Sequence, residues 1–372
     1  MKKFIFGKLV DEENLCNLEH ERNEILRHIN TENNVVIYGP RNYGKTSLVK
    51  NIVVKNFRKT HKKPFIFFVD LFNITDDKSL TFRLKAALEH AMVEIPLKKL
   101  TDEIKSFVAH MRPEISIDPV TGATSLSLKA VDYQNTQSIY NIFDVLKNIA
   151  KKRELLLIFD EFQDIVRLKS AQGIIRGFLQ EIPSPVIIMG SKSHLLGKIF
   201  LSPKEPFYQW GATVNFEPIE YEVYHAYIEE RFKQRKLRFA LPVSVKLQDN
   251  MHRVPESINI VCNEIMENYE NIEIQQEHIN QTIISIIETR QAQYEELLRY
   301  YSLNEQIIMA SVAKRGSLKQ YNAVDYLSAL KMNNKTVATI FKKLIDEGHI
   351  ENHEDAYRIN DPLLEIYFKL YR

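Results

Sequence analysis

A glycine loop that joins an apolar run to a helical segment restricts the fold of this chain more than any other feature. In the stretch NNVVIYGPRNYGKTSLVKN, apolar residues 35–38 lead into Gly39 and then into Gly44, Lys45 and Thr46. This spacing is the pattern GxxxxGK[ST], in which backbone N–H groups converge on phosphate oxygens at the start of a helix. A chance glycine turn is the alternative. The stretch predicts a strand, a phosphate-binding loop and a helix.

The residue types in this loop suit a nucleotide and its metal ion. The Lys45 ammonium is expected to reach the β and γ phosphates, and the Thr46 hydroxyl is expected to bind Mg²⁺. The residues expected to bind the nucleotide are Gly39, Pro40, Arg41, Asn42, Tyr43, Gly44, Lys45, Thr46 and Ser47.

The first 216 residues alternate short apolar runs with amphipathic segments, which is typical of a parallel sheet covered by helices. The chain is therefore expected to be an α/β protein. The expected strands are residues 35–38, 65–70, 155–160, 186–191 and 213–216. Between the second and the third, RPEISIDPVTGATSLSLKAV predicts a hairpin. It belongs to an insertion at about 98–130, which is either a surface elaboration or a contact for a neighbouring subunit or partner.

A pair of carboxylates follows the third expected strand. ELLLIFDEFQDI ends its apolar run with Asp160 and Glu161, at the carboxyl edge where open parallel sheets bind ligands. Asp160 is expected to hold the Mg²⁺ shell, and Glu161 to orient or deprotonate the attacking water. An ordinary helix N-cap is the alternative interpretation of the pair. Gln163 and Asp164 are interpreted as helix surface.

A polar side chain also follows the next expected strand. VIIMGSKSH places Ser191 at the strand tip, beside the strand that carries Asp160. From there its hydroxyl can hydrogen-bond the γ-phosphate or the water, so Ser191 is the candidate sensor. Lys192 is interpreted equally well as a second polar contact or as a solvated lysine.

The pattern becomes helical from residue 220 onward, and no strand signal interrupts it until the end. The last seventy residues predict three helices and a two-stranded wing, the order of a winged helix-turn-helix. A polar segment around 273–280 is the expected linker. The expected domains are a P-loop core at 1–217, a helical lid at 218–283 and a winged helix domain at 284–372.

Charge and cysteine content exclude several classes of protein. Fifty Lys and Arg against 48 Asp and Glu leave a net charge of +2, which gives no global attraction to nucleic acid or membrane. The two cysteines, Cys16 and Cys262, cannot form a disulfide framework. The N-terminus lacks an apolar run of signal-peptide length, and the longest apolar runs are strand-sized. The sequence therefore predicts a cytoplasmic protein.

With these motifs in place, the sequence resembles the archaeal-type P-loop ATPases, which belong to the AAA+/STAND-like NTPases, and is most similar to their bacterial branch. The similarity is carried, in order, by LCNLEHE, YGPRNYGKTSL, FFVDLFNI, LLLIFDEFQDI, IMGSKSHLLGKIF, PFYQW, RVPESINIVCNEI and YRINDPLLEIYF. It implies an ATPase core that uses ATP and Mg²⁺, a helical lid and a C-terminal winged helix. By position, it assigns the phosphate, Mg²⁺, acidic-pair and sensor roles to Lys45, Thr46, Asp160, Glu161 and Ser191.

One lid position keeps the family pattern and three positions around the nucleotide depart from it. Pro255 matches the lid proline that packs near the base. Leu18 replaces an arginine of the N-terminal motif, Asn42 replaces the second of two consecutive arginines, and Arg253 replaces a lid glycine. Arg253 is either a sensor for the γ-phosphate or a surface arginine at a helix start. These departures predict slower or partner-dependent turnover.

Two functions of different classes fit these features. In the first, ATP binding closes the lid, hydrolysis reopens it, and the winged helix reports the change to a protein client. In the second, the protein resembles origin-recognition ATPases and binds DNA under the control of ATP. Residues 303–372 carry ten Lys and Arg against nine Asp and Glu, so DNA contact and protein contact through the winged helix stay equally open.

The source of an arginine finger is a separate question. Related ATPases place a trans-acting arginine near a subunit interface, but PFYQWG contains none. Arg176, on the helix after the acidic pair, is the alternative candidate. A homo-oligomer is compatible with this assignment. The acidic pair, the sensor serine and the lid favour hydrolysis over phosphoryl transfer to a small molecule.

Overall fold

The chain divides into two compact units. The computed structural model describes residues 2–93, 113–117, 124–128, 136–191, 193–353 and 355–372. The core unit is Leu9–Glu217, and the C-terminal unit combines Met1–Lys8 with Pro218–Arg372. The polypeptide therefore passes between the units twice, after residue 8 and after residue 217.

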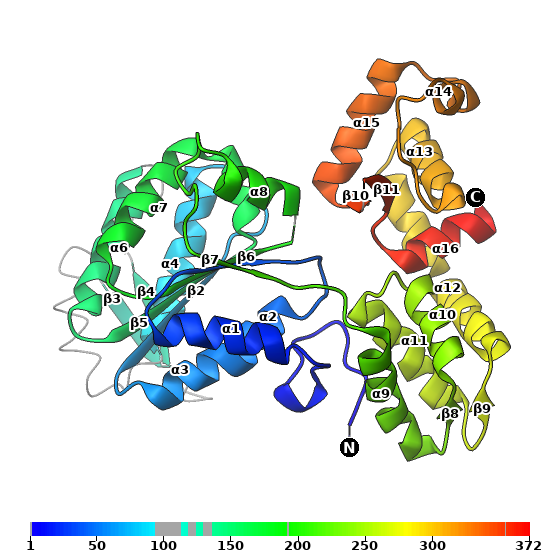
Figure 1. Ribbon diagram of the computed structural model, residues 1–372. Helices are drawn as coiled ribbons and strands as arrows, with labels where there is room; N and C mark the ends of the chain where they lie inside the picture. The colour runs from blue at the N-terminus through cyan, green and yellow to red at the C-terminus, as the bar shows by residue number, and fades with distance from the viewer. Residues whose placement is uncertain (1, 94–112, 118–123, 129–135, 192, 354) are drawn as a thin grey trace. The chain divides into compact units, whose positions relative to one another are not determined.

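A five-stranded parallel sheet forms the centre of the core unit (Figure 1). Its strand order is β2-β5-β6-β1-β7. The strands are β1 (Val35–Tyr38), β2 (Pro64–Asp70), β5 (Glu154–Asp160), β6 (Val186–Gly190) and β7 (Ala212–Asn215). All five strands predicted from the apolar runs are confirmed. Because β6 lies between β1 and β5, its tip lies between the phosphate loop and the acidic pair.

Helices cover both faces of this sheet, because successive strand residues point to opposite sides. Leu157 and Ile188 pack in one hydrophobic layer, and Ile158 and Met189 pack in the other. The first layer is completed by α4 (Asp77–Val93), α6 (Thr136–Ala150), η3 (Phe162–Arg167), α7 (Lys169–Glu181) and α8 (Ser193–Leu201). The second is completed by α1 (Glu19–Asn30), α2 (Lys45–Leu48), the π-helical turn η2 (Val49–Val53) and α3 (Val54–Thr60).

Two further elements of the core unit lie outside these layers. The short helix η1 (Glu12–Asn14) precedes α1. Strands β3 (Pro113–Ile117) and β4 (Thr124–Leu128) pair antiparallel, which confirms the predicted hairpin. The rest of the insertion predicted at about 98–130, and Lys192, lie outside the described residues.

The C-terminal unit begins with helices and a small sheet. Its first elements are α9 (Tyr221–Phe232), η4 (Lys233–Arg235), β8 (Arg238–Phe239), α10 (Leu241–Asn250), α11 (Pro255–Asn268), β9 (Glu273–Ile274) and α12 (Gln276–Arg299). Because β8 and β9 pair parallel, the prediction that no strand interrupts this region is wrong. The segment predicted as a linker is β9 and the first turn of α12, where Gln275 and His278 form a capping box. Helix α12 runs through position 283, where a domain boundary is predicted.

Three helices and a hairpin follow, the order of a winged helix-turn-helix. They are α13 (Leu303–Arg315), α14 (Val324–Leu330), α15 (Asn334–Glu347), β10 (Ile350–His353) and β11 (Ala356–Ile359), and α16 (Pro362–Tyr371) ends the chain. Local signals set the helix ends: Ser302 and Glu305 form a capping box before α13, and Gly348, at φ 84°, ends α15. None of the described helices combines the length and the hydropathy that a membrane span requires.

Candidate nucleotide site

The phosphate loop joins β1 to α2, as predicted, and its glycines are needed for shape and space. A Cβ at Gly39 would lie 2.6 Å from the Cβ of Phe216, and Gly44 has φ 84°. Asn42 also has a left-handed backbone, with φ 63°, which Asn adopts more readily than most residues. Its side chain is exposed. The loop therefore tolerates Asn42 in place of arginine without strain.

Lys45 is buried and folds back over the loop. Only 6% of the residue is exposed, and its Nζ donates to the carbonyl oxygens of Gly39 at 2.8 Å and Pro40 at 2.6 Å. Burial lowers the pKa of its ammonium to about 8, against the attraction of Glu161 and Asp160. The structure thus places a buried cation between the loop and the acidic pair.

Thr46 and Asp160 meet directly. Thr46 Oγ1 donates to Asp160 Oδ2 across 2.9 Å. Burial raises the pKa of the Asp160 carboxyl to about 6, although the hydrogen bond from Thr46 opposes this shift. A hydroxyl and a carboxylate are the oxygen ligands that Mg²⁺ prefers. The pair therefore fits the predicted Mg²⁺ ion.

Glu161 lies in a small hydrogen-bond network. Its Oε2 accepts hydrogen bonds from Ser191 Oγ, across 2.9 Å, and from Gln163 Nε2. Arg41 Nε donates in turn to Ser191 Oγ across 3.3 Å. The structure brings the predicted base and the predicted sensor together with Arg41 of the phosphate loop.

Two residues near this network, Gln163 and Asp70, were misjudged or missed from the sequence. Gln163 is 1% exposed, so its prediction as helix surface is wrong, whereas Asp164 is half-buried on η3 and accepts a hydrogen bond from the backbone of Asn73 across 2.6 Å. Asp70 ends β2 opposite Asp160 in the strand register; after burial, its charge is a further cause of the raised pKa of Asp160. An acidic residue at the end of FFVD was a usable signal for Asp70.

Residues that precede the loop in sequence pack against it. Leu18 is buried, and its Cδ1 would lie 3.5 Å from a Cβ at Gly44. Ser47 Oγ accepts a hydrogen bond from the backbone N–H of Val10 across 3.0 Å, and Asn51 Nδ2 donates to the carbonyl of Val10 across 2.7 Å. Leu18 therefore packs against the phosphate loop.

Two predicted binding residues, Arg253 and Pro255, belong to the C-terminal unit. The Arg253 guanidinium donates to the carbonyls of Pro218 at 3.2 Å and Ile219 at 2.6 Å, and it lies over the ring of Tyr221, 4.3 Å from the centroid. It is therefore not an unattached surface arginine: it binds the segment that follows the core unit. Pro255 is the first residue of α11. A contact of either residue with a nucleotide stays a prediction.

Arg176 lies away from this network. It lines a hollow of about 330 Å³ together with Asn34, Ser184 and Trp210, which precede β1, β6 and β7, whereas the phosphate loop follows the opposite end of β1. Arg176 therefore cannot serve the phosphate loop of its own chain. A role toward a neighbouring subunit stays a prediction.

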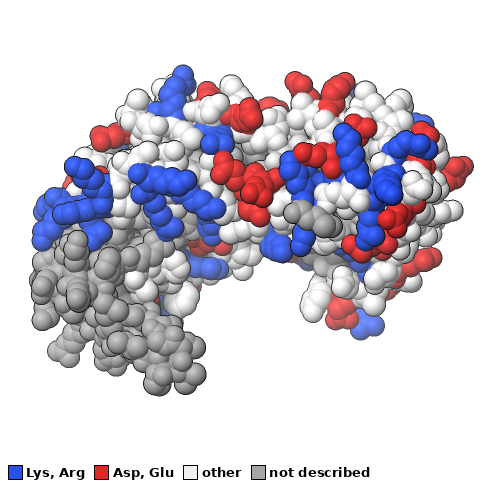
Figure 2. All heavy atoms as spheres, turned by 90° about the horizontal axis from the view of Figure 1, so that it is seen from below, with Lys and Arg blue, Asp and Glu red and all other residues white. Residues whose placement is uncertain are grey.

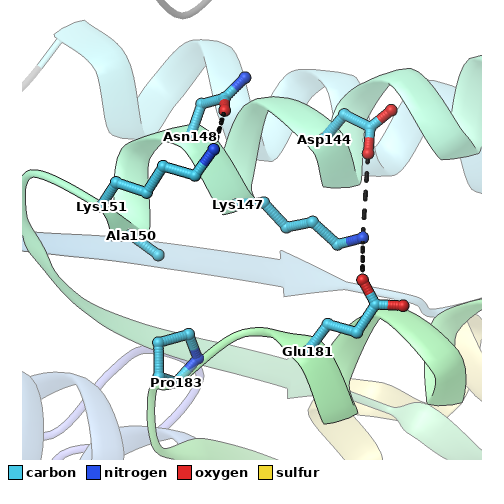
Figure 3. Close-up of a pocket in the computed structure, with 7 residues that line it drawn as sticks. All are labelled: Asp144, Lys147, Asn148, Ala150, Lys151, Glu181 and Pro183. Atoms are coloured by element: carbon cyan, nitrogen blue, oxygen red, sulfur yellow. Dashed lines mark hydrogen bonds and ion pairs between the residues drawn. The ribbon is translucent and has the colours of Figure 1, made fainter.

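A second hollow, of about 440 Å³, lies at the same edge of the core unit (Figure 3). Its lining residues are Asp144, Lys147, Asn148, Ala150, Lys151, Glu181 and Pro183. Figure 3 shows Lys147 between two carboxylates, and its Nζ lies 4.0 Å from Asp144 and 2.5 Å from Glu181. This hollow is separate from the phosphate loop; Lys147 pairs with its two carboxylates, and Lys151 donates to the amide oxygen of Asn148.

Sequence comparisons relate the chain to nucleotide-binding proteins. Residues 15–192 match a family model described as an ATPase domain predominantly from Archaea. That range contains the phosphate loop, the acidic pair and Ser191. An uncharacterized ATP-binding protein of Methanocaldococcus jannaschii is 27% identical over 209 residues, 54% of this chain and 55% of that protein. The chain therefore spans about half the length of this curated relative.

Solved structures with the same fold include three archaeal proteins. The Walker-type ATPase of Pyrococcus abyssi has a TM-score of 0.65 at 16% identity, covering 98% of this chain and 99% of that one. The Aeropyrum pernix ORC2 protein, in ADPNP-ADP complexes, has a TM-score of 0.52 at 14% identity, with 99% and 96% covered. The Aeropyrum pernix ORC1 protein, in complex with DNA, has a TM-score of 0.52 at 12% identity, with 100% and 98% covered. At these identities, the likeness shows the fold alone.

Proposed function

Residues 15–192 form an ATPase domain of the kind found predominantly in Archaea, and from this premise we propose that the chain binds ATP with Mg²⁺ and hydrolyses it to drive a conformational switch. The observation that carries the proposal is the network in which Glu161, Ser191 and Arg41 meet. The proposed base, Glu161, thus has Ser191 and Arg41 as neighbours, and a phosphate loop alone would not need such a base.

The residues divide the work of hydrolysis. The Lys45 ammonium is held by loop carbonyls in the nucleotide-free protein, and its positive charge stabilises the negative charge of the phosphate oxygens when ATP is bound. Thr46 and Asp160 would hold Mg²⁺, which neutralises phosphate charge when bound. Glu161 accepts the proton of the attacking water, and Ser191 and Arg41 are the donors next to it.

The test separates nucleotide binding from turnover. Lys45→Ala is expected to abolish ATP binding, and Glu161→Gln is expected to bind ATP while its turnover falls about 100-fold or more. Glu181→Gln, at the hollow of Figure 3, is the control and should behave as the wild type. Retained turnover in Glu161→Gln would contradict the assigned base. Absence of turnover in the wild type would overturn the proposed function.

The switch is supported by the hydrogen bonds made by the two segments through which the chain passes between the units. At the first passage, Val10 is bonded to Ser47 next to the phosphate loop. Only three positions earlier, the backbone N–H of Gly7 donates to Glu256 of α11 across 2.9 Å. The carbonyl of Ile5 accepts from Asn259 of the same helix, also across 2.9 Å. One short segment is therefore attached to both units.

The second passage has the same design. Phe216 N–H donates to the carbonyl of Tyr38 across 2.8 Å, next to Gly39, while Arg253 holds the carbonyls of Pro218 and Ile219. Both segments thus lead from the phosphate loop to the N-terminal end of α11. A shift of the loop on nucleotide binding would be passed to the C-terminal unit along two short connections, each too short to absorb a large displacement.

Hydrogen–deuterium exchange tests this coupling. Addition of ATP to Glu161→Gln is expected to change the exchange of residues 3–10, 216–221 and the start of α11, and Asn259→Ala is expected to reduce that change in the C-terminal unit. Changes confined to the core unit would contradict the switch. The same ATP-bound protein, used as bait in a native lysate, is the means to identify the client.

A second function, ATP-regulated DNA binding, is favoured by one feature of the core unit. The segments before β2 and β5 lie side by side, because Pro64 is opposite Glu154 in the strand register. Helix α3 and these two segments carry Lys55, Arg58, Lys59, Lys62, Lys63, Lys151, Lys152 and Arg153. The chain has 50 Lys and Arg against 48 Asp and Glu in total. When these eight basic residues and the neighbouring Glu154 are left out, 42 Lys and Arg remain against 47 Asp and Glu, so the rest of the chain is net acidic. Figure 2 shows basic side chains gathered over part of the core unit.

Salt-dependent binding to duplex DNA, with and without ATP, tests this alternative. Phosphate contacts supply most non-specific affinity and set its salt dependence. Reversal of charge at Lys59, Lys62 and Lys63 should therefore weaken binding and reduce the salt slope. The same reversal at Lys319, Lys335 and Lys342, which are exposed in the last seventy residues, tests DNA contact through the winged helix separately. No binding at low salt would remove DNA as the ligand.

A further inference from the structure

We propose that Gln163 is a positioning residue that holds the Glu161 carboxylate by one oxygen and leaves the other oxygen to take the proton from water. The inference rests on the proposed hydrolysis and goes beyond it, because nothing in the phosphate-loop motif or in the acidic pair requires an amide at position 163.

The first observation is the burial of this amide. Gln163 is 1% exposed, and its Nε2 donates to Oε2 of Glu161. Its Oε1 is buried and has no hydrogen-bond partner among the described residues. A buried amide with one unsatisfied oxygen is less stable than an apolar side chain of the same shape would be. The bond to Glu161 is the gain that explains why the position is polar.

The second observation is that two donors converge on a single oxygen. Ser191 Oγ donates to the same Oε2 of Glu161 across 2.9 Å. Arg41 donates to Ser191, so the serine proton is directed toward the glutamate. Within the described part of the chain, no hydrogen bond reaches Oε1 of Glu161. The carboxylate is therefore fixed through Oε2, and Oε1 is the oxygen available to a water molecule.

The third observation is the space that the neighbouring strand provides. A Cβ at Gly190 would lie 2.1 Å from Gln163 Oε1 and 2.8 Å from Leu196 Cδ1. Any residue larger than glycine at the end of β6 would displace the amide. Glu161 itself has a left-handed backbone, with φ 50° and ψ 39°, which is unfavourable for a residue with a side chain. Its position thus depends on side-chain partners as well as on the backbone.

The chain offers a matched control in Gln172. It is also 1% exposed, and its Nε2 donates to the carbonyl of Ile165 across 3.2 Å. Its Oε1 also lacks a hydrogen-bond partner among the described residues. Gln172 has no hydrogen bond to Glu161. Gln163→Ala and Gln172→Ala therefore remove similar buried amides, and only the first removes a bond to the carboxylate.

The experiment measures kcat, KM, ATP affinity and melting temperature for both variants. Gln163→Ala is expected to lower kcat about 10- to 100-fold with ATP affinity unchanged, because misplacement of a reacting group by about 1 Å has an effect of that size. Gln172→Ala is expected to lose similar stability while keeping kcat. Gly190→Ala is expected to lower kcat also, and Gln163→Ala combined with Gly190→Ala should cost no more than the larger single effect.

The outcomes separate this inference from the proposed function. An active wild type with unchanged kcat in Gln163→Ala would overturn the positioning role alone. Equal losses of kcat in Gln163→Ala and Gln172→Ala would also overturn it, since they would report lost packing. A wild type without turnover would overturn both proposals together.

Discussion

The Thr46 hydroxyl donates a hydrogen bond to Oδ2 of Asp160 across 2.9 Å, although 114 positions separate the two residues in the sequence. The contact joins the start of α2 to the end of β5, which are brought together because a single strand, β6, separates β1 from β5. It sets side by side the two residues that the sequence predicts as Mg²⁺ ligands.

Removal of the Thr46 hydroxyl should weaken the Mg²⁺-dependent part of ATP binding. Thr46→Ala is expected to lower ATP affinity about 10- to 100-fold in Mg²⁺, whereas Thr46→Ser, which keeps the hydroxyl, should stay near the wild type. Binding measured by calorimetry in Mg²⁺ and in a chelator checks this. If the alanine variant loses as much affinity in chelator as in Mg²⁺, the hydroxyl does not act through the metal.

The Asp160 carboxyl should make the nucleotide-free protein less stable at neutral pH. Burial raises the pKa of this group to about 6, above its ordinary value near 3.8. The unfolded chain therefore releases this proton at lower pH than the folded chain does. As pH rises from about 4 to 6, the wild type should lose up to about 3 kcal/mol of stability relative to Asp160→Asn, and the difference should stay constant above pH 6.

Urea unfolding of both proteins across this pH range, without nucleotide and without Mg²⁺, is the measurement. Thr46→Ser serves as the control, because it keeps the carboxylate and its donor. A stability difference that does not vary between pH 4 and 6 would contradict the raised pKa.

Arg253 should stabilise the C-terminal unit. It is not expected to contact phosphate, so its removal should have little direct effect on turnover. Arg253→Ala leaves the carbonyls of Pro218 and Ile219 without their donor, so a loss of about 2 kcal/mol is expected. Arg253→Lys should recover part of it. Chemical unfolding measures stability, and steady-state assays measure turnover. A strong fall in kcat at unchanged stability would favour the sensor role instead.

The two departures at Leu18 and Asn42 should respond differently to arginine. Leu18 is buried against Gly44, so Leu18→Arg would bury an unpaired charge and is expected to cost about 3 kcal/mol or more. Asn42 is exposed in a left-handed turn, so Asn42→Arg should cost only about 1 kcal/mol. Steady-state assays then decide whether Asn42→Arg raises the rate. No gain would count against the hypothesis that this departure slows turnover.

The parts of the site that follow from local pattern were predictable. Each apolar strand and the residue at its tip are adjacent in sequence, so Lys45, Asp160 and Ser191 could be assigned to one sheet edge before the fold was known. Gln163 could not, because the chain forms the short 3-10 helix η3 after β5 and turns this amide inward under Gly190. An ordinary helix there would have placed it differently.

Pairings between distant segments also could not be predicted from the sequence. The polar run 273–280 has linker composition, yet Ile274 and Phe239 form a small parallel sheet, because burial of both side chains stabilises a pairing that neither segment shows alone. The contacts of Arg253 could not be predicted either, because they also join distant parts of the chain. Its partners are carbonyl oxygens of residues 218 and 219, and backbone acceptors leave no signal in the amino-acid sequence.

The assignment of the first eight residues to the C-terminal unit fixes an order of events during synthesis. Residues 3–7 leave the ribosome before the core unit, but the side chains that bind them, Arg231, Glu256 and Asn259, are made only after the whole core unit. At 5–20 residues per second, that interval is on the order of ten seconds or more. The core unit can therefore fold first, and the N-terminal segment can close onto α9 and α11 only after both helices have been made.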